Sequence, residues 1–367
     1  MTWVMPPETA PQERTWMAFP RPGLTLGDDA ASAEAARVAW AATANTISEH
    51  QPVTIVVDPV ARSDARRLLS EQVDVLEAPL DDFWMRDIGP TFVVDDVTGE
   101  LGAVDWVFNG WGANPWSTWT RDAEVAATVA AAAGAERIPS LLVNEGGAIH
   151  VDGSGTVLVT ETVQLDPRRN PYADRERVEL ELARTIGATD VVWLPRGLTR
   201  DYDGFGTRGH VDMVATFAGA PSDTSGTRAT SGTRATSATS ATSTTSATTT
   251  SRTLLLHAQP DAGHPDHLVM PQIRRALEQT TDATIVELPA PSTRTDDDGP
   301  VDWNYVNHVV VNGAVIACAF GDPVADDRAR GILADVYPGR QVRSIDAREV
   351  FARGGGLHCI TQQQPAV

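Results

Sequence analysis

Short apolar runs, each about the length of a β-strand, alternate along this chain with longer stretches of helical periodicity. Two strands followed by one helix form a unit that recurs four times. In chain order, the strand, strand and helix of these units are predicted at 91–94, 102–106 and 123–133; at 148–151, 156–160 and 174–186; at 210–217, 253–257 and 265–279; and at 307–311, 315–320 and 325–337. The N-terminal portion can supply a fifth unit, with a helix over 32–49 and strands over 53–57 and 73–76. The pattern predicts an internally repeated α/β architecture.

A long polar segment interrupts the third unit. Residues 222–251 consist almost entirely of Ser, Thr, Ala, Gly and Arg, with near-repeats of Ser-Gly-Thr-Arg-Ala-Thr. Such a segment buries too little apolar surface to offset the entropy lost on ordering, which predicts disorder. We interpret it as an insertion over about 220–252 at the tip of the third hairpin, within a single domain that spans residues 1–367. A linker between two domains is the alternative.

Composition narrows the class of protein. The 367 residues, 42% of them hydrophobic, are enough for a substantial core. A formal net charge of −20 speaks against nucleic acid or an anionic membrane as partner and suits a small cationic substrate, although solubility explains an acidic chain equally well. The chain has no apolar run of about 18 residues, and its N-terminus lacks a charged segment followed by an apolar one, which predicts a cytoplasmic protein.

The basic and sulfur-containing residues exclude several kinds of chemistry. All 29 basic residues are arginines, so Schiff-base and pyridoxal phosphate chemistry and the phosphate-binding P-loop, which need a lysine, are excluded. The two cysteines do not make a disulfide framework, and no CxxC or HExxH spacing indicates a metal. We therefore expect neither a cofactor nor a metal.

One of the two cysteines has the surroundings of a reactive group. Cys359 follows His358 at the end of the run Gly354-Gly355-Gly356-Leu357, and glycines let a backbone pass close to a ligand. Cys318 lies instead in the apolar run 315–320 and is interpreted as a small core residue. For Cys359, a buried thiol in a disordered tail is the alternative.

A base and a carboxylate stand close together at His210 and Asp212. On a β-strand these two side chains share one face, while Val211 and Met213 share the other. A solvated edge strand is the alternative, but the glycines of the preceding segment 204–209 indicate a backbone shaped around a ligand.

Two further acids lie beside glycines. Asp87 belongs to the run Trp84-Met85-Arg86-Asp87-Ile88-Gly89-Pro90, a predicted loop before a strand, and it either makes a local turn or ion pair or faces a pocket. Glu145 precedes Gly146-Gly147 at the start of the second hairpin, where a backbone can approach closely.

Together, one cysteine, one histidine and three acids lie at the ends of repeated units, where a closed arrangement would bring them to one centre. Carboxylates match the fork of N–H donors on a guanidinium, so the acids suggest a planar cation of this kind as substrate. Cys359 would attack the guanidinium carbon, and His210 would protonate the departing ammonia and then activate water.

On these residues the chain resembles the agmatine deiminase family, which belongs with the bacterial-type peptidylarginine deiminases in the guanidine-modifying superfamily. The resemblance runs from about Thr9 to Pro365, apart from the low-complexity segment. The motifs that carry it are Trp-x-Arg-Asp-x-Gly-Pro from Trp84, Phe108-Asn109-Gly110-Trp111-Gly112, Glu145-Gly146-Gly147, Gly209-His210-Val211-Asp212, Phe320-Gly321-Asp322-Pro323 and the Cys359 segment.

The resemblance implies a fold, an activity and a set of roles. The fold is a five-bladed, pseudo-symmetric α/β propeller of strand-strand-helix units with the active site on its axis. Cys359 is the implied nucleophile, His210 the general acid and base with Glu145 near it, and Asp87 and Asp212 the guanidinium clamp. The residues expected to contact substrate are Trp84, Arg86, Trp111, Arg208 and Gly356. Hydrolysis of a thiouronium intermediate would release ammonia and a ureido product, N-carbamoylputrescine from agmatine in polyamine biosynthesis, without a cofactor. A homo-oligomer is compatible with this family.

Two departures from the family pattern affect the substrate. Where members commonly have Glu-Thr-Asp before Gly-His, this chain has Gly206-Thr207-Arg208, and where they commonly have Asn it has Gly356. The lost acids and the added Arg208 can weaken binding of the distal ammonium of agmatine or favour a substrate with a carboxylate, such as arginine or peptidyl-arginine. An amidinotransferase, which passes the same intermediate to an amine, and a catalytically inactive binding protein are further alternatives.

Overall fold

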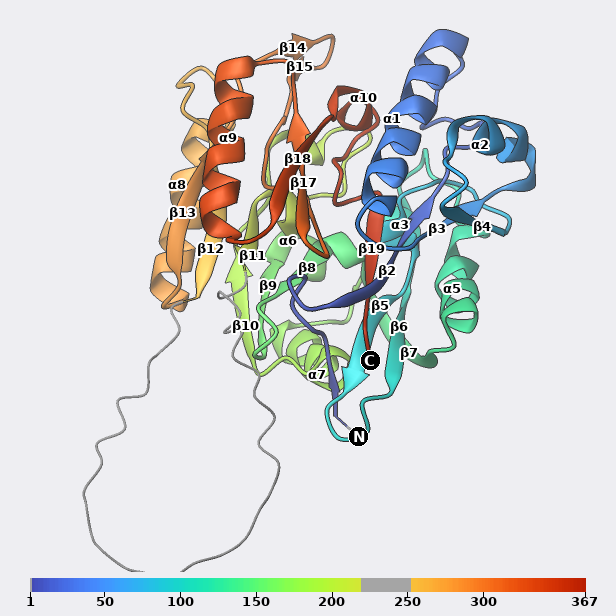
Figure 1. Ribbon diagram of the computed structural model, residues 1–367. Helices are drawn as coiled ribbons and strands as arrows, with labels where there is room; N and C mark the ends of the chain where they lie inside the picture. Colours follow the sequence, from blue (N-terminus) through green and yellow to red (C-terminus); the bar gives the residue numbers. More distant parts are fainter. Residues whose placement is uncertain (1, 219–251) are drawn as a thin grey trace, which may run out of the picture.

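The longer helices lie outside the strands in the computed structural model, which describes residues 2–218 and 252–367 (Figure 1). The helices are α1 (Ala30–Ser48), α2 (Arg62–Leu68), α3 (Met85–Ile88), α4 (Gly110–Ala113), α5 (Val125–Ala133), α6 (Glu161–Gln164), α7 (Arg175–Ile186), α8 (Asp266–Thr280), α9 (Pro323–Val336) and α10 (Arg348–Phe351). None of these helices, in the described part of the chain, combines the length and the apolar character needed to cross a bilayer.

The strands pair into several small sheets. They are β1 (Trp3–Val4), β2 (Gln12–Ala18), β3 (Val53–Val57), β4 (Val73–Glu77), β5 (Thr91–Asp95), β6 (Leu101–Val107), β7 (Glu136–Val143), β8 (Ile149–Val151), β9 (Thr156–Thr160), β10 (Asp190–Leu194), β11 (Ala215–Ala218), β12 (Thr253–Ala258), β13 (Thr284–Pro289), β14 (Thr295–Asp296), β15 (Gly299–Pro300), β16 (Val309–Val311), β17 (Ala314–Ala319), β18 (Gln341–Asp346) and β19 (Thr361–Pro365). In the described ranges the sheet orders are β1-β5-β6-β7, β10-β9-β8, β11-β12-β13, β16-β17-β18, β19-β2-β3-β4 and the short pair β14-β15.

The four hairpins predicted from the sequence are confirmed. Each repeating unit contains one strand more than was predicted. The antiparallel pairs are β5-β6, β8-β9, β11-β12 and β16-β17. A third strand follows each helix and pairs in parallel with the second strand, as β7, β10, β13 and β18 do. A parallel pair needs a crossover of a dozen or more residues, which the helix supplies. The repeating unit is therefore strand-strand-helix-strand. The predicted strand-strand-helix repeat lacked the third strand and was incomplete.

The predicted strand over 210–217 is wrong in its first half. Strand β11 begins at Ala215, and His210 leads into a short 3₁₀ turn, Val211–Met213. The cause lies in Asp201, whose Oδ2 accepts the backbone N–H groups of Gly209 at 2.6 Å and His210 at 2.9 Å and so withdraws them from sheet pairing. His210 and Asp212 are consequently not on one face of a strand. The predicted insertion over 220–252 lies outside the described residues, apart from its last residue.

Aromatic packing fixes the segment that precedes α3. Trp40 of α1 is fully buried and lies edge-on to Phe83 and Trp84, with ring centroids 5.2 and 5.6 Å apart. Such pairs contribute about 0.5–1.5 kcal/mol beyond the burial of their area. Asp122 adds a polar anchor, because its carboxylate accepts the backbone N–H groups that lead into Phe83. Contacts with Trp40 and Asp122 thus fix the position of Trp84 and of α3, which follows it.

The C-terminal strand β19 is an edge strand of the sheet β19-β2-β3-β4. β19 pairs antiparallel with β2, as the red and dark blue strands show side by side (Figure 1). The side chain of Gln364 accepts a hydrogen bond from the Trp16 indole at 2.9 Å. Cys359 lies two residues before this strand, so the alternative of a disordered tail is wrong.

We expect removal of residues 361–367 to destabilise the whole protein, because it leaves β2 without its antiparallel partner and exposes the core side of that sheet. The melting temperature, followed by circular dichroism, should fall by at least ~10 °C. Removal of Val367 alone, which is exposed, serves as the control and should leave the melting temperature unchanged. Equal melting temperatures for both truncations would contradict the assigned role of β19.

Candidate active site

Cys359 is buried at the junction between a glycine-rich turn and β19. Its side chain lies beside Asn307, whose Nδ2 donates to the sulfur at 3.2 Å, and its thiol lies 3.5 Å from Asp212 Oδ2. The second cysteine, Cys318, lies within β17 and donates to the carbonyl of Asn307, so it is a core residue as predicted. Only one of the two sulfur atoms therefore faces ionisable side chains.

His210 stands between two of the predicted acids. Its Nε2 lies 3.3 Å from Glu145 Oε2, and its Nδ1 lies 3.8 Å from Asp87 Oδ1. The 3₁₀ turn after His210 places Asp212 next to Cys359. The structure therefore brings the five predicted catalytic side chains together from segments far apart in the sequence.

Asp87 is held in place by donors from two other segments. Trp111 donates from its indole nitrogen to Asp87 Oδ2 at 2.9 Å, and the backbone N–H of Gly147 donates to Oδ1 at 3.1 Å. The residue lies in the single-turn helix α3, where the sequence predicted a loop. Trp111 has a left-handed backbone, with φ of 56°, which turns its indole toward Asp87.

Glu145 is fully buried and carries its own counterion. Arg169 donates from Nε to both carboxylate oxygens, at 2.9 and 3.1 Å, and the side chains of both residues have no exposed surface. Burial alone would raise the pKa of Glu145, but Arg169 and His210 outweigh it and lower the pKa. Glu145 is therefore a fixed anion beside His210.

A glycine occupies the centre of the cluster. A Cβ atom on Gly147 would lie 2.5 Å from His210 Nδ1 and 3.1 Å from both Asp212 Oδ2 and Asp87 Oδ1. These contacts are tighter than van der Waals packing allows, so only glycine leaves the three side chains free to share one space. The Gly-Gly pair after Glu145 has this steric basis.

The charges and the burial of the cluster raise the pKa values of Asp87 and His210. Burial, together with Glu145 and Asp212, raises the pKa of Asp87 to about 6 although His210 opposes the shift. Burial would lower the pKa of His210, but Asp87, Glu145 and Asp212 outweigh it and raise the pKa to about 9. At neutral pH His210 is thus an imidazolium, which suits a general acid.

The pKa values of Cys359 and Asp212 shift in opposite directions. Burial and the negative charges of Asp212 and Asp87 raise the pKa of the thiol well above its usual value. Burial acts on Asp212 in the same direction, but His358, His210 and Arg86 lower its pKa. The cluster therefore holds a carboxylate next to an un-ionised thiol, and a cation placed between them would favour the thiolate.

The pocket beside Cys359 has a largely aromatic lining. The residues that line it are Trp84, Asp87, Trp111, Trp116, Phe205, Thr207, Arg353, Gly354 and Cys359. Its free volume is about 20 Å³, which is room for about one water. Phe205, Arg353 and Gly354 also line an outer cavity of about 610 Å³, whose lining includes Asp203, Asp298 and Asp302 as well as Arg200. The small inner pocket and the larger cavity therefore meet at Phe205, Arg353 and Gly354.

The predicted substrate contacts divide into two groups. Trp84 and Trp111 line the pocket. Arg86 lies behind it, with Nε donating to the carbonyl of His358 at 3.3 Å. Arg208 lies 3.1 Å from Asp166, and Gly356 packs against the amide of Asn307, where a Cβ would meet Oδ1 at 2.3 Å. The last three residues are outside the lining of this pocket.

Several residues of the site were not predicted from the sequence. They are Asn307, Trp116, Phe205, Thr207 and Arg353. Asn307 had a usable signal, because it stands two residues before β16, and polar site residues such as Asp212 and Glu145 likewise lie shortly before a strand. Trp116 and Phe205 lie in irregular segments, and nothing in their local sequence shows which way an aromatic side chain points.

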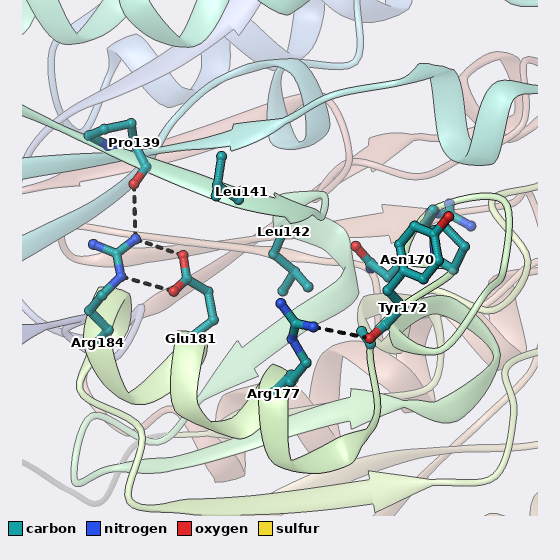
Figure 2. A pocket seen from close by; sticks show the side chains of 11 residues that line it. Pro139, Leu141, Leu142, Asn170, Tyr172, Arg177, Glu181 and Arg184 are labelled. Atoms are coloured by element: carbon teal, nitrogen blue, oxygen red, sulfur yellow. Dashed lines mark hydrogen bonds and ion pairs between the residues drawn. The ribbon is translucent and has the colours of Figure 1, made fainter.

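A roomier cavity lies on the far side of Arg169. It has a volume of about 540 Å³, and Figure 2 shows its labelled lining residues Pro139, Leu141, Leu142, Asn170, Tyr172, Arg177, Glu181 and Arg184. Glu181, its one acid among the lining residues, is paired with Arg184 at 2.6 Å. This cavity offers no nucleophile and no free base, so we assign the chemistry to the smaller pocket beside Cys359.

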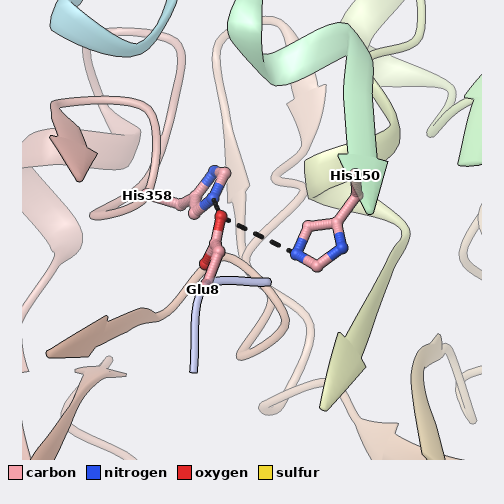
Figure 3. A group of neighbouring side chains, drawn as sticks. All are labelled: Glu8, His150 and His358. Carbon is pink, nitrogen blue, oxygen red and sulfur yellow. Dashed lines mark hydrogen bonds and ion pairs between the residues drawn. The ribbon is translucent and has the colours of Figure 1, made fainter. Parts of the chain in front are cut away.

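Glu8, His150 and His358 form a group whose ligand atoms lie within 4.8 Å of one another (Figure 3). Hydrogen bonding speaks against a metal there. His150 Nδ1 accepts the backbone N–H of Phe217, so Nε2 carries the proton and lies 2.5 Å from the hydroxyl of Thr216. Both ring nitrogens of His358 face carboxylates. Neither imidazole therefore offers the free lone pair that a metal ion needs.

The fold and this cluster together define the class: a mixed α/β protein with a buried polar centre built around one cysteine. Known proteins place it more closely. The model of the Porphyromonas-type peptidyl-arginine deiminase family matches residues 4–224 and 230–365. The chain therefore belongs to this family.

The similar proteins share one name. A protein of Streptomyces coelicolor with the provisional name agmatine deiminase is 48% identical, over 100% of this chain and 99% of its own. An agmatine deiminase of Stutzerimonas stutzeri is 37% identical, over 99% of this chain and 96% of its own. The solved structure of the agmatine deiminase of Enterococcus faecalis is similar with a TM-score of 0.84 at 27% identity, over 99% of this chain and 96% of that one. These relatives mark the chain as a hydrolase of carbon–nitrogen bonds.

We expect Gly147→Ala to abolish most of the activity, because the added methyl group displaces His210 and the two neighbouring carboxylates. The loss of kcat/KM should be at least ~100-fold, since displacements of about 1 Å in an active site have that effect. Gly331→Ala is the matched control, because its Cβ would meet nothing within 4 Å. Unchanged kcat/KM in Gly147→Ala would show that the centre of the site lies elsewhere.

Proposed function

We propose that this chain hydrolyses agmatine to N-carbamoylputrescine and ammonia through a covalent intermediate on Cys359. The observation that carries the proposal is the placement of one imidazolium and two carboxylates around Gly147, with the thiol of Cys359 3.5 Å from Asp212, beside the pocket that Cys359 and Asp87 line. A planar cation that sits on the carboxylates presents its carbon to the sulfur and its amino groups to His210. This geometry suits displacement of ammonia from a guanidinium carbon.

The carboxylates Asp87 and Asp212 form the proposed guanidinium clamp. Asp212 uses Oδ2 toward His358 and Cys359, whereas its Oδ1 is buried and has no hydrogen-bond partner among the described residues. A buried acceptor without a donor is costly, and a charged N–H donor removes that cost. We assign Asp212 Oδ1 to one edge of the guanidinium and Asp87 to another.

The substrate itself activates the thiol in this proposal. The positive charge of the guanidinium offsets Asp87 and Asp212, the same charges that hold the pKa of Cys359 high. The thiol loses its proton to solvent, and the thiolate adds to the guanidinium carbon. The C–N bond breaks as His210 donates its proton to the departing nitrogen, so ammonia leaves and a thiouronium stays on the sulfur. His210 next accepts one proton from water, whose oxygen adds to the carbon. The C–S bond then breaks, and the remaining hydroxyl proton passes to the sulfur, which releases the ureido product and restores the thiol.

Agmatine is the substrate that the charges around the pocket support best. Arg208 replaces an acid of the family pattern, but it lies outside the pocket lining, with its guanidinium 3.1 Å from Asp166, a carboxylate that Arg168 and Arg169 also approach. The aspartates that line the outer cavity outnumber its two arginines, Arg200 and Arg353, although burial raises the pKa of one of them, Asp302, to about 7; this excess of negative charge favours the ammonium end of agmatine over a carboxylate. The inner pocket is smaller than the substrate, so Phe205 and Trp116 must separate for agmatine to enter.

The proposal includes the arrangement of the sheets. Four of the five sheets of three or four strands in the described ranges repeat one order, an antiparallel hairpin followed by a parallel strand. The fifth, β19-β2-β3-β4, pairs the last strand of the chain antiparallel with β2 and adds two parallel strands. We propose that they are the blades of a five-bladed propeller within one catalytic domain, with Cys359 near the axis. Polyamine biosynthesis through putrescine is the corresponding role.

We expect Cys359→Ala to release no ammonia from agmatine, because the nucleophile is absent, and to keep its fold. Ammonia is measured from a panel of agmatine, arginine, arginine-terminated peptides and other small guanidines. Cys318→Ala is the control, since it removes a thiol that lies in β17, outside the pocket. Release of ammonia from another guanidine alone would replace the substrate, and release by Cys359→Ala would refute the mechanism.

A second prediction concerns the charge of the ligand. At neutral pH the cationic alkylator 2-chloroacetamidine should inactivate the enzyme at least ~10-fold faster than neutral 2-chloroacetamide, because only the cation lowers the pKa of Cys359 on binding. Both rates are divided by the rate of each reagent with glutathione. Equal normalised rates would contradict activation of the thiol by the substrate.

A further inference from the structure

Glu8 reaches the proposed site from the opposite end of the chain. It lies between β1 and β2, and its carboxylate oxygen Oε1 is 2.6 Å from His358 Nε2 (Figure 3). His358 Nδ1 lies 2.8 Å from Asp212 Oδ2 on its other side. All three side chains are buried, so water does not compete for these bonds.

The geometry determines the charge of His358. Each ring nitrogen has a carboxylate oxygen within hydrogen-bond distance, and a carboxylate only accepts. Both nitrogens must therefore carry a proton, which makes the ring an imidazolium. Burial and Arg86 would lower the pKa of His358, but Glu8 and Asp212 outweigh them and raise it. Burial would likewise raise the pKa of Glu8, but His358 and Arg86 hold it well below its usual range.

His358 also determines how Asp212 is oriented. The bond from Nδ1 occupies Oδ2, and Oδ1 is left without a partner among the described residues. Oδ1 is the atom that the proposed function assigns to the guanidinium. A change at Glu8 would therefore act on the substrate through two hydrogen bonds, without contact between Glu8 and the substrate.

We propose that Glu8 is a positioning residue of the reaction: it keeps His358 doubly protonated, and His358 in turn holds Asp212 as a carboxylate with Oδ1 free for the substrate. The inference rests on the proposed function. Its alternative is a purely structural ion pair that ties the N-terminal segment to the segment around Cys359, supported by Arg86 at 3.7 Å from Glu8. The two differ in their dependence on pH.

The surroundings of this chain of bonds contain other titratable groups, which the experiment must hold constant. Those that act electrostatically on Glu8, His358 or Asp212, or respond to them, are Arg86, Asp87, His150, His210, His308, Tyr337 and Cys359. A substitution at Glu8 that keeps the shape of the side chain leaves all of these residues in the protein and removes only the charge of Glu8, which also acts on His150, His308 and Tyr337.

Glu8→Gln is the informative variant, because it removes the charge and keeps the shape. A neutral His358 can still donate from Nδ1 to Asp212 while its Nε2 accepts from the new amide. Asp212 then loses one of the three cations that lower its pKa, while His210 and Arg86 remain, so its pKa rises and it becomes protonated at a higher pH. The acid limb of the pH profile is the range in which kcat/KM for agmatine falls as the pH is lowered. We expect this limb to move to a pH about one unit higher in Glu8→Gln, so that kcat/KM on the limb is about tenfold lower than in the wild type. At higher pH the activity should recover.

Glu13→Gln is the matched control, since it makes the same charge change at an exposed position and should leave the limb in place. An unmoved acid limb in Glu8→Gln would overturn the proposal in favour of a structural ion pair. If Glu8→Gln does not fold, His358→Asn, whose amide can donate to Asp212 without charge, carries the same test. An unmoved limb there likewise overturns the proposal.

A readout without turnover separates this inference from the proposed function. Nitrogen-15 NMR of the imidazoles should show both nitrogens of His358 protonated in the wild type at neutral pH and one in Glu8→Gln, with His358→Asn identifying the signal. Wild-type protein that releases no ammonia from agmatine would refute the proposed function and leave this result standing. A singly protonated His358 in the wild type would overturn the inference itself.

Discussion

Negative charge buried around one thiol is the constraint on which the site depends. Asp87, Glu145 and Asp212 lie close together with almost no exposed surface, and carboxylates placed so would repel one another and take up protons. The protein balances them with cations that are equally buried: Arg169 against Glu145, His210 among the three acids, and His358 against Asp212. The balance keeps Asp212 and Glu145 ionised and His210 protonated. It leaves the thiol of Cys359 un-ionised, and the guanidinium of the proposed substrate would offset the negative charges around that thiol.

The fold meets this constraint by bringing residues to one place from turns rather than from strands. His210 and Asp212 flank a 3₁₀ turn that Asp201 holds away from the sheet, Asp87 sits in a single helical turn, and Gly147 follows Glu145 where a side chain would collide with its neighbours. Strands β11 and β5 start directly after two of these turns, so the sheets fix positions while the turns direct the side chains. Even the first and last segments of the chain take part, since Glu8 and His358 are hydrogen-bonded across 350 positions of sequence.

Prediction from the sequence succeeded where the signal was local. Hairpins and amphipathic helices follow from short-range alternation, and the four pairs from β5-β6 to β16-β17 were placed within a few residues. The third strand of each unit was missed because the exposed residues of strands such as β18 dilute its apolar pattern. The alternation of apolar and polar residues also made the predicted strand begin too early, at His210. The hydrogen bonds that prevent strand pairing there come from Asp201, which lies outside the short segment on which the strand prediction rested. Among the expected substrate contacts, Trp84 and Trp111 line the pocket, whereas Arg86, Arg208 and Gly356 pack behind or beside it.

The sequence by itself determined which chemistry was available: arginine without lysine, one cysteine in a glycine-rich setting, and acids and a histidine beside glycines. It also determined the repeat of hairpin and helix, because periodicity is a property of neighbouring residues. Only the tertiary structure decided which of these groups carry charge and which way they face. The protonation of His358 depends on Glu8 and Asp212, and the free oxygen of Asp212 depends on His358. Electrostatic interactions of this kind act over a few ångströms in space, and distance along the chain does not measure them.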